Sequence, residues 1–447
     1  MRKLTKKWQM LLYAMGGMGV NLLNLMVGTY LCSAIAASGF KNPDLIPNHT
    51  FYSNDLVYLL AWGVFGTIAK IIDGVIDVPM ASFTDNLKSK FGRRRPALII
   101  GLIPMILAYA LFAGVTPNPA GAAWSNMIFY FVVLVVFYCF YTLTMVTYYA
   151  TFTEIVETQE QRNFISNVKS VCDIVYFILG FVVVSAMLKG MNIRLVALLV
   201  LPMVLTMLIP LFLIKENSTK DGVVTDENGK ESKPVNLIKS IAYTFKNKNY
   251  IIWMCVYSFM TFGVQLFLSG INEYFAATGM EMMFVMMAAF GPVPLTLLLY
   301  NWITRRFGFG VSFRYTLCVY AVGMLAMFGV SLLPAGTLKM VLAICTGLIS
   351  SLGIGAMFSV AYSIPSEMAA EEEKKTGVSN AAMYFAVQGL FSAVATGIGG
   401  YFVLNALKKA EHIEYMTPIC AAAMVVSFIL SFYLPKYVCN LGKKSKK

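Results

Sequence analysis

The sequence predicts an all-α membrane protein with twelve transmembrane helices in two pseudo-symmetric six-helix bundles. Three observations support this fold class: the composition is strongly apolar, the apolar residues gather in twelve long runs, and the two halves carry matching loops. Of the 447 residues, 58% are hydrophobic and 13% are charged, whereas soluble domains are about half apolar and a quarter charged. Lipid is therefore the expected solvent.

Each apolar run is long enough to cross a bilayer, which takes roughly 20 helical residues. The runs cover residues 9–39, 55–80, 97–115, 125–152, 164–188, 194–214, 250–277, 281–302, 313–333, 338–365, 379–406 and 414–435. Backbone groups in lipid cannot bond to water, so only helices or closed barrels cross it. The runs are too long and too uniformly apolar for barrel strands, so we expect helices.

Positive charge between the runs predicts the orientation of the chain. Most loop Lys and Arg fall on one side, which the positive-inside rule assigns to the cytoplasm. They are Arg2, Lys3, Lys6, Lys7, Lys88, Lys90, Arg93, Arg94, Arg95, the lysine-rich stretch 215–248, Arg305, Arg306 and the tail 443–447. We expect a multi-pass cell-membrane protein with both termini in the cytoplasm. The net charge of +13 reflects these loops and does not indicate nucleic-acid binding.

One long polar segment, residues 215–249, is predicted to be a cytoplasmic linker between residues 1–214 and residues 250–447 with their basic tail. The loop FGRRR at 91–95, after the second run, has a counterpart RRFG at 305–308, after the eighth. Two weakly similar six-helix halves form the repeat pattern of the major facilitator architecture.

Three charged residues lie within the second run: Lys70, Asp73 and Asp77. Helical spacing puts them on nearly one face. Two carboxylates share one ammonium, and like charges so close favour a proton or a cation between them. An unpaired intramembrane charge is costly, so we predict that Asp73 and Asp77 bind a coupling ion, Na⁺ or H⁺. The alternative is that Lys70 and Asp73 only neutralise each other.

Other polar residues in the runs are weaker candidates. Lys169 and Asp173 are four residues apart; they could pair, or Lys169 could reach an anionic group of the substrate or the two acids of the second run. Asn21, Gln265 and Gln388 could bind solute or join helices. Glu273, near the outer end of its run, is expected to be solvated by water, and Lys408 is grouped with the outer loops.

The fourth run carries an aromatic and hydroxyl stripe with helical spacing. It comprises Tyr138, Tyr141, Thr142, Thr144, Met145, Tyr148 and Tyr149. Aromatic faces beside hydroxyls suit stacking on a sugar ring or another planar solute. The alternative is that these tyrosines only pack against neighbouring helices.

The motif DGVID at 73–77, followed by Asp85 and FGRRRP at 91–96, resembles the glycoside-pentoside-hexuronide:cation symporter family, the relatives of melibiose permease. YAMGGMGVN at 13–21, YYA at 148–150 and EEEKKTG at 371–377 extend the similarity along nearly the whole chain. The resemblance implies a major facilitator fold and uptake driven by Na⁺, Li⁺ or H⁺. It also implies that Asp73 and Asp77 are the cation-site carboxylates, with Thr142 as a nearby hydroxyl.

The chain departs from that family at four positions. Met145 and Asn21 stand where acids are common, Gln388 stands where a lysine is common, and Ile76 replaces an asparagine. One negative and one positive charge are lost together at Met145 and Gln388, so the charge of the site can still balance. The changes weaken the case for galactoside recognition and for Na⁺, which favours the proton alternative.

These features predict a symporter for a glycoside, oligosaccharide or hexuronide, with a non-sugar or lysolipid-like cargo as the alternative. We expect no enzyme activity and no cofactor, because the two histidines, His49 and His412, lie in or beside outer loops. We expect the protein to function as a monomer in the bilayer, with the solute and the coupling cation as its ligands.

Solute is predicted to bind near the bilayer midplane between the halves. The candidate contacts are Asn21, Lys70, Tyr141, Met145, Tyr148, Tyr149, Lys169, Asp173, Gln265 and Gln388. A cytoplasmic gate of charge pairs is predicted among Asp85, Arg93, Arg94, Arg305 and Glu367.

Overall fold

The computed structural model describes residues 4, 6–155, 159–216, 218, 247–376 and 381–443, and within these ranges the chain forms helices and no strands. Twelve helical spans are long and apolar enough to cross a membrane, which confirms the predicted fold class. Most of the predicted linker, 215–249, lies outside the described residues.

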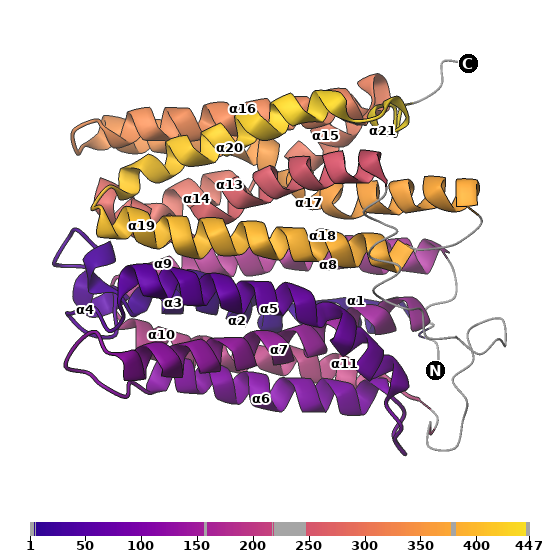
Figure 1. The fold of residues 1–447 in the computed structure, drawn as a ribbon, viewed down its shortest axis with the longest axis horizontal. Helices are drawn as coiled ribbons and strands as arrows, with labels where there is room; N and C mark the ends of the chain where they lie inside the picture. Colours follow the sequence, from indigo (N-terminus) through magenta and orange to yellow (C-terminus); the bar gives the residue numbers. More distant parts are fainter. Residues whose placement is uncertain are drawn as a thin grey trace.

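The first six spans occupy one half of the bundle (Figure 1). They are α1 (Lys7–Met15), α2 (Gly17–Leu25), a π-helical segment (Met26–Leu31) and α3 (Cys32–Ala34); α5 (Leu59–Asn86); α6 (Arg94–Gly114); α7 (Trp124–Glu154); α8 (Gln159–Ile178), a π-helical segment (Leu179–Val183) and α9 (Val184–Leu188); and α10 (Ile193–Val200), a 3₁₀ segment (Leu201–Met207) and α11 (Leu208–Leu213). A short helix, α4 (Ile46–His49), lies in the loop after the first span.

The last six spans form the other half. They are α13 (Lys248–Thr278); α14 (Met282–Phe290) with α15 (Val293–Phe307); α16 (Phe309–Ser331); α17 (Thr337–Thr376); α18 (Ala381–Gly397), a π-helical segment (Ile398–Val403) and α19 (Leu404–Lys409); and α20 (Met416–Leu430) between 3₁₀ segments (Ile413–Tyr415 and Ser431–Tyr433), followed by α21 (Lys436–Cys439). Helix α1 begins and α21 ends at the same end of the bundle (Figure 1).

Two spans differ from the predicted runs. The eighth is interrupted at Gly291 and Pro292, because proline lacks the N–H that would continue the helical ladder. The tenth continues to Thr376, well past the apolar run, because its polar extension contains Ala, Glu and Lys, which are strong helix formers.

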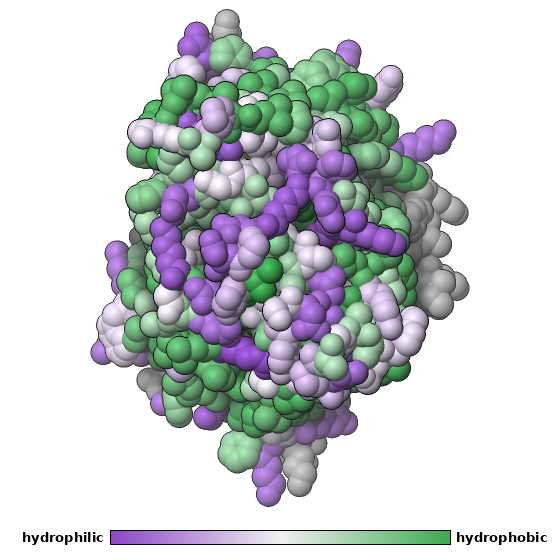
Figure 2. Space-filling model, turned by 90° about the vertical axis from the view of Figure 1, so that its left-hand side faces the viewer, coloured by the Kyte–Doolittle hydropathy of each residue, from purple (hydrophilic) through white to green (hydrophobic). Residues whose placement is uncertain are grey.

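The outer surface of the bundle is apolar, as expected for a protein in lipid. Leu295 and Phe212 are 71% and 70% exposed, although both lie within spans. Seen from the end opposite the start of α1, polar residues gather in the centre and apolar residues surround them (Figure 2). The sides of the bundle thus suit hydrocarbon and this end suits water.

The halves approach each other closely along α5 and the eleventh span. A Cβ added at Gly66 would lie 2.0 Å from the Tyr401 ring, and one at Gly74 would lie 2.4 Å from the Ala393 side chain. Glycine is needed at both positions because any side chain would push the helices apart. The Thr67 hydroxyl donates to the Gly397 carbonyl at 2.8 Å across this contact.

Candidate functional site

The charged cluster of α5 is built around Asp73. Lys70 Nζ donates to Asp73 Oδ2 at 2.8 Å, and the Thr142 hydroxyl of α7 donates to Asp73 Oδ1 at 2.8 Å. The Lys70 ammonium also lies 4.1 Å from the centre of the Tyr138 ring. Both members of the ion pair are largely buried, with side chains 17% and 14% exposed. Asp73 therefore has both oxygens occupied by donors.

Asp77 lies one turn further along α5 and faces the other half. A Cβ added at Gly389 of α18 would lie 3.3 Å from Asp77 Oδ2. The described contacts of Asp77 include the Thr142 hydroxyl and the charges of Asp73 and Lys70. Two carboxylates and one ammonium thus meet at the interface between the halves.

A pair of tyrosines joins the cluster to the C-terminal half. The Tyr138 and Tyr401 hydroxyls are 2.7 Å apart, and Cys32 Sγ lies 3.7 Å from the Tyr401 hydroxyl. Tyr401 lies in the π-helical segment of the eleventh span, so its place at the site was not evident from the sequence. The only sequence signal was a tyrosine after a glycine pair, GGY at 399–401.

A cavity of about 150 Å³ lies beside this cluster, between the halves. Residues of both halves line it: Asn21, Asn24, Leu25, Gly28, Thr29, Lys70, Tyr138, Tyr176, Phe177, Phe181, Gln265, Leu268, Ser269, Thr396 and Tyr401. We call it the central cavity. Three of the predicted solute contacts, Asn21, Lys70 and Gln265, are among these residues.

The three π-helical segments each contribute to the central cavity. Gly28 and Thr29 come from the first, Phe181 from the second and Tyr401 from the third. A π-helical turn widens the helix and frees a backbone group locally, and such turns are frequent at functional sites. Their convergence on one cavity supports its assignment as the binding site.

A second series of polar contacts runs through Asn21. The Tyr141 hydroxyl donates to Asn21 Oδ1 at 3.1 Å, and Asn21 Nδ2 donates to Asp173 Oδ1 at 3.5 Å. Asp173 is ion-paired with Lys169. Of the two interpretations of these residues, the structure therefore shows the one in which they pair with each other. Lys169 Nζ also lies 5.2 Å from the centre of the Tyr149 ring.

The remaining predicted solute contacts lie outside the lining of the central cavity. Tyr148 is fully buried, stacks on Tyr13 at 5.1 Å and donates to the Tyr13 carbonyl at 3.0 Å. Met145 packs towards Gly17 of α2. Gln388 accepts a 2.8 Å hydrogen bond from the Trp253 indole. In this conformation these three residues join helices.

The predicted cytoplasmic gate is described in part. Arg94 is buried and its guanidinium donates to the Thr84 hydroxyl at 3.1 Å, within the N-terminal half. Its backbone N–H donates to Glu216 Oε2 at 2.7 Å, which caps the start of α6. The side chain of Asp85 lies outside the described part of the chain. Arg93, Arg305 and Glu367 lie at the same end of the bundle, and whether they form a gate stays a prediction.

The expectation that water solvates Glu273 was wrong. Its side chain is fully buried and ion-paired with Lys408, which is buried as well rather than part of an outer loop. Ser33 of α3 donates to Glu273 Oε1 at 2.5 Å from the other half. A Cβ at Gly39 would lie 2.6 Å from Lys408 Cε, so the outer loop covers the pair. Sequence alone could not reveal this, since the partners are far apart in the chain.

Two further contacts join the halves at the end of the bundle opposite the start of α1. His49 Nδ1 lies 3.0 Å from Asn272 Oδ1, and Lys41 pairs with Glu414 at 3.2 Å. Together with the hydrogen bond from Ser33 to Glu273, they link the two halves at this end of the bundle.

Twelve spans around a polar cavity between two halves define a multi-pass membrane transporter. The chain matches the family described as MFS/sugar transport protein over residues 12–438, where MFS denotes the major facilitator superfamily. It belongs to that family and is a transporter rather than an enzyme. No curated protein sequence is significantly similar to it.

Solved structures share the fold at low sequence identity. A bacterial homologue of the human lysosomal transporter Spinster, inward-facing and unoccupied, is 13% identical, with 99% of each chain covered and a TM-score of 0.62. The nucleoside transporter NupG is 14% identical, with 96% of this chain and 99% of that chain covered and a TM-score of 0.59. A bacterial homologue of the iron transporter ferroportin, inward-facing, is 12% identical, with 96% and 98% covered and a TM-score of 0.60.

Proposed function

We propose that the chain is a secondary active symporter that couples uptake of a small polar solute to Na⁺ or H⁺. The solute class is a glycoside, oligosaccharide or hexuronide. We further propose that it works as a monomer in the cell membrane, with both termini in the cytoplasm, since the basic loops lie on that side.

The observation that carries this proposal is the double contact of Lys70. Its side chain lines the central cavity and also donates to Asp73 of the carboxylate pair. A cation or proton arriving at Asp73 and Asp77 competes with Lys70 for the carboxylate oxygens. Lys70 is then released towards the cavity, where it can donate to a solute hydroxyl or carboxylate. Ion binding thereby raises the affinity for solute, which is the thermodynamic requirement for coupling.

Na⁺ and H⁺ differ in what they need from these residues. Na⁺ requires several hard oxygen ligands, which Asp73, Asp77 and Thr142 could begin to supply. A proton needs only one carboxylate that is not neutralised by a neighbouring positive charge. Asp73 and Asp77 meet this need, because the two acids share the single ammonium of Lys70. The carboxylate left in excess supports either ion, so the ion has to be identified by experiment.

Transport follows from alternating access. The outer contacts of Glu273, His49 and Lys41 hold the outer end closed and would have to break for solute to enter from that side. A ligand that binds between the halves lowers the free energy of the conformation in which both halves contact it.

The test is uptake of radiolabelled glycosides and hexuronides into right-side-out vesicles, with the Na⁺ and pH gradients varied independently. Asp73→Asn and Asp77→Asn should abolish accumulation against a gradient while sparing exchange of solute across the membrane. Asp44→Asn, in an exposed loop, serves as the control. Wild-type accumulation in both span variants would refute the coupling role of these residues.

A further inference from the structure

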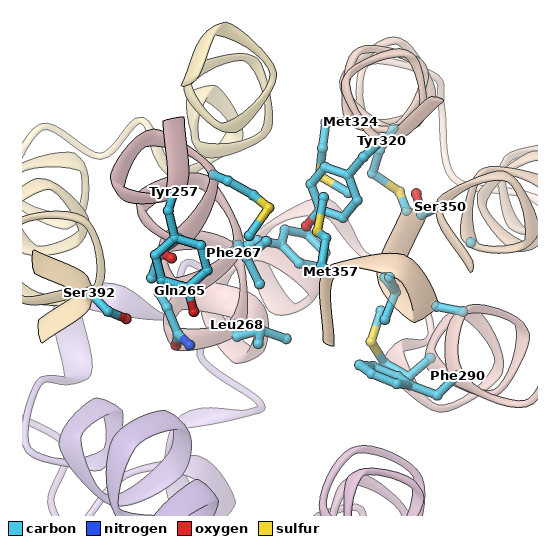
Figure 3. A pocket seen from close by; sticks show the side chains of 18 residues that line it. Tyr257, Gln265, Phe267, Leu268, Phe290, Tyr320, Met324, Ser350, Met357 and Ser392 are labelled. Atoms are coloured by element: carbon cyan, nitrogen blue, oxygen red, sulfur yellow. The ribbon is translucent and has the colours of Figure 1, made fainter. Parts of the chain in front are cut away.

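A second cavity, of about 230 Å³, lies inside the C-terminal half (Figure 3). Helices α13, α14, α16 and α17 enclose most of it, and the side chains that line it are mainly apolar. Five methionines contribute: Met260, Met286, Met324, Met327 and Met357. We call it the apolar cavity.

Only a few side chains separate the apolar cavity from the central cavity. Gln265 and Leu268 of α13 line both. Phe290, which lines the apolar cavity, stacks at 5.0 Å on Phe177 and at 5.5 Å on Phe181, which line the central one. The central cavity and the apolar cavity therefore adjoin each other at the Gln265 amide and at the stacked rings of Phe290, Phe177 and Phe181.

The size and chemistry of the apolar cavity indicate an organic occupant. Protein interiors are close-packed, and voids much larger than a water molecule are few because their walls lose dispersion contacts. Cavities with apolar walls stay dry and take up apolar ligands instead. Methionine side chains are flexible and polarisable, so they adapt to the shape of such a ligand.

We propose that the apolar cavity receives the aryl or alkyl group of an amphiphilic glycoside whose sugar occupies the central cavity. This inference rests on the proposed function and narrows its substrate class. Gln265, at the junction, offers an amide donor and acceptor to the polar linkage between the two parts. A planar aryl group would pass the Phe177, Phe181 and Phe290 rings by stacking on them.

The test is equilibrium binding to purified protein in lipid nanodiscs, which does not depend on transport. The probes are matched methyl and phenyl glycosides of glucose, galactose and glucuronic acid. In at least one pair the phenyl compound should have a Kd about ten-fold lower, because its ring is removed from water. Equal affinities in all three pairs would overturn the proposal.

Filling the cavity provides the decisive variant. Ala289 is buried and lines the cavity, so Ala289→Phe should raise the Kd of the phenyl compound to that of its methyl partner. Met287→Phe is the matched control, because Met287 lies on the same helix with 49% of its surface exposed. A phenyl preference that persists in well-folded Ala289→Phe would contradict the proposal.

A second variant covers the case in which Ala289→Phe does not fold. The double truncation Met324→Ala with Met357→Ala enlarges the cavity and removes contacts, so the phenyl preference should fall about five-fold while methyl binding stays unchanged. An unaltered preference would count against the subsite. Lack of ion-driven uptake together with a retained phenyl preference would refute the symport proposal and leave this subsite standing.

Discussion

The residues around Asp73 place two carboxylates, one ammonium and one hydroxyl close together. Lys70 and Thr142 occupy the two oxygens of Asp73, so this carboxylate is held in one position. Asp77 is ion-paired with no lysine among the described residues and lies against Gly389 of the other half. A change in the charge of Asp77 would therefore directly alter the contact between the halves.

Thr142→Ala should weaken ion binding. The variant removes a 2.8 Å hydrogen bond to a carboxylate, and such charge-assisted bonds contribute about 1.5 to 3 kcal/mol. We expect the half-saturating concentration of the coupling ion to rise about ten-fold in uptake assays. Thr147→Ala is the control, since that hydroxyl donates only to the Leu143 carbonyl of its own helix at 2.7 Å. Equal effects of the two variants would show that Thr142 acts only through packing.

His49 makes the outer contact sensitive to pH. Burial lowers the pKa of His49 from its ordinary 6.5, while the hydrogen bond to Asn272 and the charge of Glu273 oppose that shift. The unfolded chain takes up the proton near pH 6.5, whereas the folded protein remains neutral to lower pH. The contribution of His49 to stability is thus complete above about pH 6.5 and is lost as the pH falls below it.

Thermal unfolding in detergent, measured between pH 8 and pH 5, tests this prediction. His49→Gln should flatten the acid decrease in Tm relative to wild type, because glutamine keeps a polar group without titrating. An unaltered acid decrease in His49→Gln would exclude this histidine as the source.

The buried pair of Glu273 and Lys408 joins two helices of the C-terminal half. It links α13 to α19, and Ser33 connects both to α3 of the other half. One carboxylate oxygen, Glu273 Oε2, has no hydrogen-bond partner among the described residues. A buried charge pair in which one oxygen is unsatisfied is costly to keep buried.

Lys408→Met should destabilise the protein by about 3 kcal/mol, because it leaves the buried Glu273 carboxylate without its countercharge. The double variant Glu273→Gln with Lys408→Met should recover most of that loss in a double-mutant cycle of detergent unfolding. Lys189→Met breaks the exposed pair with Glu281, whose side chains are 54% and 48% exposed, and should cost less than about 1 kcal/mol. Additive effects of Glu273→Gln and Lys408→Met would mean that the buried pair is not coupled.

The whole molecule was largely predictable from its sequence, whereas its internal contacts were not. The apolar runs determined the number of spans because a bilayer imposes a length on each helix. The charges of α5 also identified a candidate site without any knowledge of the fold, since charges inside apolar runs are rare.

Contacts between distant spans could not be predicted in the same way. Glu273 and Lys408 belong to different spans, and nothing in the local sequence indicates their pairing. Tyr401 reaches Tyr138 through a π-helical turn, which has no clear sequence signature. Tyr148 has the spacing of a cavity-lining residue, but its ring stacks on the ring of Tyr13 instead. Helical periodicity identifies a face without identifying the neighbour of that face.

The proposed symport requires that movement of the solute be coupled to movement of an ion. The most direct measurement is solute-induced ion movement in proteoliposomes with no ion gradient imposed, followed with a pH-sensitive dye and with ²²Na⁺. Addition of a transported solute should drive H⁺ or Na⁺ inward in wild type, and Asp77→Asn should abolish that ion flux while solute still equilibrates. Solute entry in wild type without movement of either ion would contradict the account.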